Sequence, residues 1–185
     1  SAMQKKNFLE SLTKLPLPAK KILASELNEK VLKWQTDKND GGLFPKISQT
    51  NFKNLANDKK VKALLRSIFG NSSFLTWCIN AEPNFFFHII SQGPDKVFQT
   101  IIQQLNNDSK KYDQQNLISR DLRIAKRRIA LLIAIADISK FWSLKKVIKS
   151  ISLFADTALS TAITYLVWVA EKRGILETSN VNDRA

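Results

Sequence analysis

The sequence of 185 residues predicts an all-α protein, an irregular array of short helices followed by two long antiparallel helices. Apolar residues recur every third or fourth position, and no segment alternates between apolar and polar residues for long, so strand signals are weak. All five prolines and four of the five glycines lie at or before Pro94, which confines the strongest chain breaks to the first half. With 44% apolar residues, the chain can bury a sizeable core.

Residues 1–94 are predicted to form short helices separated by sharp breaks. Asp58 is placed to cap a helix that runs to Phe69, Gly70 to adopt the left-handed conformation just past its end, and Ser72 to cap the next helix. The last two prolines fit the first turn of a helix, where a missing N–H costs nothing. The breaks are expected at Leu15–Pro18, Asn39–Gly42, Gly70–Ser72, Glu82–Pro83 and Gly93–Pro94.

Residues 95–176 are predicted to form a long-helix hairpin that packs with the first part as one domain. Neither Gly nor Pro occurs between Asp95 and Arg173, so two long helices with a break near Lys140–Ser143 are expected. Residues 177–185 are interpreted as a linker towards a further domain.

Each of these two helices has a distinct apolar face. The first is apolar at helical spacing from Ile118 to Ala136 and carries basic residues on the opposite face. The second should pack antiparallel on the first through one continuous stripe. Its members are Leu144, Val147, Ile148, Ile151, Ala155, Ala158, Ala162, Leu166 and Val169.

The composition restricts the classes of function. A formal charge of +13 suits an anionic partner, but it does not choose among nucleic acid, a phosphate-bearing ligand and an acidic protein surface. A single cysteine and a single histidine leave no internal disulfide and no Cys/His set with metal-ligand spacing, so no metal site is expected and a cytoplasmic location is the default. The apolar stretch 151–170 contains Asp156 and several hydroxyl groups, which argues against a membrane span.

The sharpest charge cluster lies on the first long helix. Between Lys110 and Lys149 there are eleven basic and three acidic residues. Guanidinium groups at helical spacing can bind phosphate oxygens in pairs, whereas charge runs are more often simply solvated, and both interpretations stay open. The candidate phosphate- or domain-facing residues are Arg120, Arg123, Lys126, Arg127 and Arg128.

Other polar and aromatic residues are interpreted as structural. Asp137 lies in the apolar half of its helix, so a buried ion pair or hydrogen bond is expected there rather than a carboxylate pair with Asp156. His88 and Cys78 are interpreted as core residues, and no catalytic residue is expected. The tryptophans should fill the core, which weakens a nucleic-acid interpretation: Trp34, Trp77, Trp142 and Trp168.

Two stretches resemble the bacterial glutamine synthetase adenylyltransferase family. The first comprises Gly70-Asn71-Ser72-Ser73-Phe74-Leu75 and Glu82-Pro83-Asn84-Phe85. The second runs from Asp121-Leu122-Arg123-Ile124-Ala125-Lys126-Arg127-Arg128 through Ala136-Asp137-Ile138 to Phe154-Ala155-Asp156. Ser73 and Ile124 depart from the family pattern, which often has Pro and Arg there. The motif residues that carry the resemblance include Gly70, Asn71, Ser72, Asp137 and Asp156.

The resemblance implies a bifunctional enzyme that transfers AMP from ATP to a tyrosine of glutamine synthetase and removes it by phosphorolysis. It implies Mg²⁺ and ATP as cofactors of the full-length enzyme, with glutamine synthetase, a PII-type signal protein and a downstream nucleotidyltransferase domain as partners. The family's Gly-Ser and Asp-x-Asp magnesium motif is missing from these residues, since Thr178–Asp183 lacks the leading glycine. This segment is therefore expected to scaffold the first nucleotidyltransferase domain and to be inactive alone, without a cofactor. The alternative is a basic helical adaptor for nucleic acid or an acidic protein.

Overall fold

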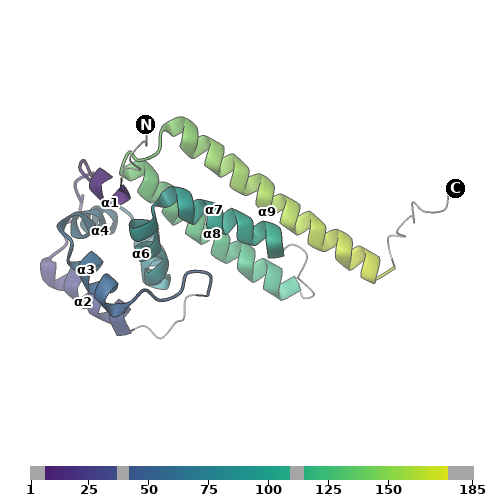
Figure 1. Cartoon of the computed structure of the whole chain (residues 1–185), viewed down its shortest axis with the longest axis horizontal. Coiled ribbons are helices and arrows are strands. Elements are labelled where there is room, and N and C mark those ends of the chain that lie inside the picture. Colours follow the sequence, from purple (N-terminus) through teal and green to yellow (C-terminus); the bar gives the residue numbers. More distant parts are fainter. Residues whose placement is uncertain (1–6, 37–41, 109–114, 175–185) are drawn as a thin grey trace, which may run out of the picture.

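The structure, a computed structural model, describes residues 7–36, 42–108 and 115–174 (Figure 1). Within these ranges the chain forms nine helices and no strand, which confirms the all-α prediction. The predicted linker 177–185 and most of the predicted break at 39–42 lie outside them. The helices are α1 (Phe8–Ser11), α2 (Ala24–Thr36), α3 (Gln49–Asn57), α4 (Lys59–Asn71), α5 (Ser73–Ala81), α6 (Pro83–Gln92), α7 (Pro94–Asp108), α8 (Gln115–Ile138) and α9 (Leu144–Lys172).

Side-chain caps and prolines mark the starts of several short helices. The Asp58 carboxylate accepts hydrogen bonds from the backbone N–H groups of Lys60 at 2.7 Å and Val61 at 3.3 Å, so it caps α4 as predicted. The Ser72 hydroxyl accepts one from the N–H of Leu75 at 3.2 Å and caps α5. Each such cap is worth about 1 kcal/mol. Both α6 and α7 begin at a proline, in agreement with the sequence.

Helix α6 is the centre of the short-helix cluster. It packs on α1, α3, α5, α7 and α8, and every residue from Pro83 to Ile90 is buried. The Phe87 ring makes edge contacts with Trp34 and Phe52, at ring-centroid distances of 6.2 and 4.8 Å. The main core cluster runs from Phe8 in α1 to Val147 in α9 and includes α6, while a small second cluster pairs Ile118 of α8 with Tyr165 of α9.

The second half contains three helices where the sequence predicted two. Helices α7, α8 and α9 pack on one another, and α9 runs back along α8 as expected (Figure 1). The predicted break near Lys140–Ser143 is present, but α7 ends at Asp108 and α8 begins only at Gln115. Asparagine and aspartate are poor helix formers, and the run Asn106–Asp108 accounts for the end of α7 without any Gly or Pro.

Helix α9 does not pack through the stripe that the sequence predicted. Its buried residues are Val147, Ser150, Thr157, Thr161 and Tyr165. The Thr161 hydroxyl donates to its own helix at the Thr157 carbonyl, 2.9 Å away, so its burial leaves no orphaned polar group. Among the stripe residues, only Val147 is buried.

The large aliphatic residues of that stripe are exposed instead, together with Leu159, which the prediction did not include. We call the following residues the α9 stripe, with their exposed fractions: Leu144 (71%), Ile148 (56%), Ile151 (50%), Leu159 (61%) and Leu166 (61%). By length and composition, α9 could cross a membrane, and it is the one such helix among the described residues, but one helix of this kind is weak evidence for a span.

Candidate functional site

The five basic candidates on α8 divide into two groups. Arg127 and Arg128 are mostly buried, with side chains 22% and 13% exposed. Arg120, Arg123 and Lys126 are exposed. The sequence predicted one basic face, whereas the structure separates its buried and solvated members.

One carboxylate holds both buried arginines. Glu82, just before α6, accepts hydrogen bonds from Arg127 Nε at 3.2 Å on one oxygen and from Arg128 Nε at 2.9 Å on the other. An Nη2 group of each arginine donates to the same oxygen as its Nε, so each pair is forked. The Glu82 side chain is itself only 12% exposed. We call these three residues the Glu82 clamp. Charge-assisted hydrogen bonds of this kind are stronger than neutral ones.

Aromatic rings cover the arginines of the clamp. The Arg127 guanidinium carbon lies 5.4 Å from the Trp77 ring centroid on α5, and that of Arg128 lies 5.1 Å from the Phe44 ring and 5.8 Å from the Phe85 ring. These are cation–π distances. The two arginines therefore connect α8 to α5, to the start of α6 and to the segment before α3.

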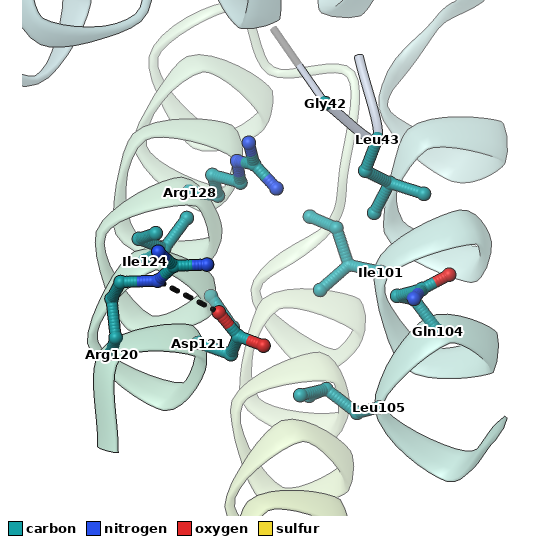
Figure 2. A pocket seen from close by; sticks show the side chains of 10 residues that line it. Gly42, Leu43, Ile101, Gln104, Leu105, Arg120, Asp121, Ile124 and Arg128 are labelled. Atoms are coloured by element: carbon teal, nitrogen blue, oxygen red, sulfur yellow. Dashed lines mark hydrogen bonds and ion pairs between the residues drawn. The ribbon is translucent and has the colours of Figure 1, made fainter. Parts of the chain in front are cut away.

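Arg120 lines a small cavity between α7 and α8, with a volume of about 250 Å³. Figure 2 shows Arg120 and Arg128 on the α8 side, facing Leu43, Ile101 and Gln104. Arg120 Nε donates to the adjacent Asp121 carboxylate at 3.4 Å, so the cavity carries both signs of charge. The full lining is Gly42, Leu43, Ile101, Gln104, Leu105, Arg120, Asp121, Ile124, Ala125 and Arg128.

Gly70 and Asn71 serve packing rather than helix termination. The prediction of a left-handed Gly70 past the end of the helix is wrong: Gly70 lies inside α4, which ends at Asn71, and its φ is not positive. A Cβ at Gly70 would overlap Pro18 Cβ and lie 2.6 Å from the Lys20 carbonyl oxygen. Only glycine permits this approach.

The Asn71 amide also holds the segment around Pro18 against the end of α4. Its oxygen accepts from the Ala19 N–H at 2.9 Å, and its nitrogen donates to the carbonyls of Leu17 at 3.0 Å and Ser67 at 2.9 Å. Together with Gly70, it ties the proline-containing segment before α2 to the end of α4.

The two predicted motif aspartates are exposed. The expectation of a buried partner for Asp137 is wrong, because its side chain is 52% exposed and lies 3.8 Å from Lys140 Nζ on the next turn. The surrounding residues Ile135 and Ala136 are buried, so the burial of α8 here is one-sided. Asp156 is exposed on α9. Within the described ranges, no three His, Cys, Asp or Glu residues come together as a possible metal site.

Sequence reasoning missed a further aspartate. Asp95, in the first turn of α7, accepts a hydrogen bond from Trp142 Nε1 at 2.8 Å and pairs with Lys146 Nζ. This carboxylate joins the start of α7 to the turn between α8 and α9. The signal was the Pro94-Asp95 pair at a helix start, but its partners lie about 50 residues away in the chain.

The predicted core residues are buried with defined roles. His88 Nε2 lies 2.8 Å from the Pro45 carbonyl oxygen and Nδ1 lies 2.7 Å from Gln92 Nε2, which suits a neutral ring with its proton on Nε2. Burial raises the pKa of the Cys78 thiol, so the thiol stays protonated and unreactive at neutral pH. Both confirm the prediction of core roles.

The prediction for the tryptophans holds in part. Trp34 and Trp142 are buried, and Trp168 packs partly buried against Tyr165 at the far end of α9. Trp77 is 54% exposed, against prediction, and lies beside the equally exposed Phe74 with ring centroids 6.0 Å apart.

Comparison with known proteins gives one family and one curated relative. The family model for glutamate-ammonia ligase adenylyltransferase matches residues 62–184. The relative is a bifunctional glutamine synthetase adenylyltransferase/adenylyl-removing enzyme of Agrobacterium fabrum, 25% identical over 131 residues. The match covers 69% of this chain but only 13% of the relative. No solved structure matches significantly.

Proposed function

Since this chain belongs to the glutamate-ammonia ligase adenylyltransferase family, we propose that its helices scaffold a nucleotidyltransferase domain in a full-length adenylyltransferase/deadenylylase. The domain would be the first of two, the one that removes AMP from a tyrosine of glutamine synthetase by phosphorolysis. In that reaction a phosphate oxygen attacks the AMP phosphorus, the tyrosine oxygen leaves with its electron pair, and ADP and free tyrosine result.

The observation that carries the proposal is the family match over residues 62–184, from within α4 to beyond the end of α9. Its span contains the Glu82 clamp, Asn71 and Asp95, and each of these joins segments that are distant in sequence. Residues with such bracing roles support a scaffold. The full-length enzyme would use Mg²⁺ and ATP, would be regulated by a PII-type signal protein and would be located in the cytoplasm.

The exposed basic residues of α8 are the ones accessible to a ligand or to another domain. The Glu82 clamp already neutralises part of the charge on Arg127 and Arg128, whereas Arg120, Arg123 and Lys126 have exposed side chains, that of Arg120 at the cavity between α7 and α8. We therefore assign the phosphate- or domain-facing role to these three. Their density at helical spacing supports this assignment.

The test uses adenylylated glutamine synthetase with inorganic phosphate. Full-length protein should release AMP as ADP, and residues 1–185 alone should release none. In the full-length protein, replacing Arg120, Arg123 and Lys126 by Gln should slow release while leaving the unfolding temperature unchanged. An unchanged rate would identify these residues as a solvated face.

One observation favours a second candidate function, a basic adaptor for single-stranded nucleic acid. Trp77 is exposed next to the Arg127 guanidinium, and the exposed Phe74 ring lies beside Trp77. Proteins that bind single-stranded nucleic acid combine such aromatic rings with cationic side chains. Binding of a fluorescent oligonucleotide that weakens steeply between about 50 and 200 mM salt would support it. Absence of binding at low salt would exclude it.

A further inference from the structure

The α9 stripe has the composition of an interface. Its five members, from Leu144 to Leu166, are each at least half exposed, and they form one line at helical spacing. At 1.5 Å per residue the line is about 33 Å long. The charged residues Lys145, Lys149 and Asp156 lie beside it rather than in it. Exposed Leu153, Ile163 and Val167 on the same helix add to this apolar surface. An apolar centre with charged residues nearby is typical of protein–protein contacts.

The packing of α9 explains why its own chain leaves the stripe uncovered. The helix turns Ser150, Thr157 and Thr161 towards the neighbouring helices, where the two threonine hydroxyls bond to backbone carbonyls. Large aliphatic side chains remain outside, although burying each one is worth about 1.5–3 kcal/mol. A contiguous line of five goes beyond the isolated apolar residues of an ordinary surface.

The length of the relative suggests that a surface covering the α9 stripe lies elsewhere in the full-length protein. The family match ends at residue 184, so all of α9 lies within it, and the matched segment is only 13% of the relative. The relative is therefore far longer than the segment that it shares with this chain. A strip about 33 Å long and 10 Å wide offers about 330 Å², below the about 800 Å² per partner of a stable interface between free proteins. A domain of the same polypeptide can use so small a contact because its effective concentration is high, whereas a free second copy lacks this advantage.

We infer that, in the full-length protein, the nucleotidyltransferase domain docks on the α9 stripe, an inference that rests on the proposed function. The domain would contribute an apolar surface to the centre of the contact and acidic groups near Lys145 and Lys149. The stripe then sets the position of the domain on the helical scaffold.

Hydrogen exchange of α9, followed by mass spectrometry, tests the contact directly. Residues 1–185 contain a continuous core of their own, so they serve as the uncovered reference. Exchange between residues 155 and 170 should be at least about 10-fold slower in the full-length protein, because covering the helix suppresses its local opening. Equal exchange in the two proteins would overturn the inference.

A pair of matched variants adds a second readout. Leu159→Glu with Leu166→Glu places two charges in the stripe, and Ser160→Glu with Thr164→Glu places two on an exposed face of the same helix away from it. In full-length protein the stripe variant should restore fast exchange and slow AMP release at least about 10-fold, while the control changes neither. In residues 1–185 both should unfold like the parent.

The remaining outcomes identify other occupants or separate the two proposals. A full-length dimer that the stripe variant dissociates would assign the stripe to a second copy, and stripe-dependent binding to anionic phospholipid vesicles would assign it to a membrane. Either overturns the inference. Unmodified full-length protein that protects α9 but releases no AMP would contradict the proposed function and leave the contact standing.

Discussion

Helices α6 and α9 are both rich in apolar residues, yet they have opposite surroundings. Every residue of α6 from Pro83 to Ile90 is buried, and helices pack around it. Helix α9 buries a face that includes serine and threonine and leaves its aliphatic stripe in solvent. A high apolar content therefore favours burial of a helix, but it does not identify the surface that buries it. For α6 the cover is its own domain, and for α9 we place it in another.

The largest effect should come from the centre of α6. Phe86→Ala removes a ring that is completely buried and leaves a cavity, so residues 1–185 should lose about 3–5 kcal/mol of unfolding free energy in a urea titration. A loss below about 1 kcal/mol would show that α6 is not the centre of the core and would remove the contrast with α9.

The Glu82 clamp should follow. Glu82→Gln leaves two mostly buried guanidinium groups without their counter-charge, and the expected loss is about 2–4 kcal/mol in the same titration. Asp156→Asn, which neutralises an exposed carboxylate, is the matched control and should change stability by less than about 0.5 kcal/mol. Equal effects would mean that the clamp adds nothing beyond net charge.

Gly70→Ala tests whether the close packing around α6 extends to α4. The added methyl group would collide with Pro18 and the Lys20 backbone, so a loss of about 1–3 kcal/mol is expected even though alanine favours helices. A stabilised variant, measured by thermal unfolding, would show that the segment before α2 moves aside without cost.

The smallest effect should come from α9. Leu159→Ala in residues 1–185 shortens an exposed side chain and should change the unfolding free energy by less than about 0.5 kcal/mol. The same substitution in full-length protein should cost more, because there the side chain would be covered. A large loss of unfolding free energy in residues 1–185 would show that Leu159 is part of the core and would contradict the contrast between α6 and α9.

Local signals allowed most of the helices to be predicted. The caps at Asp58 and Ser72 act within three residues, and the prolines that open α6 and α7 act through their own backbone. Such rules need no knowledge of the tertiary structure. The end of α7 was missed because it depends on a run of weak helix formers rather than on Gly or Pro.

The errors share a dependence on distant partners. The role of Gly70 depends on Pro18, and the burial of Arg127 and Arg128 depends on Glu82, about 45 residues away. Asp137 and Trp77 were predicted to be buried because their sequence neighbours are apolar. Which side of a helix stays exposed depends instead on how the other helices pack against it. The family resemblance came from the sequence, whereas the clamp inside its motifs required the structure.

The contacts of Asp95 bear on the mechanics of the scaffold. This carboxylate secures the turn from which α9 departs, through Trp142 and Lys146, while the opposite end of α9 extends past α7 and α8 (Figure 1). A helix of 29 residues is about 43 Å long, and burial of Thr157, Thr161 and Tyr165 holds α9 against α7 and α8 well beyond that turn. A force applied to the exposed end of α9 would therefore be transmitted to all three helices as a unit.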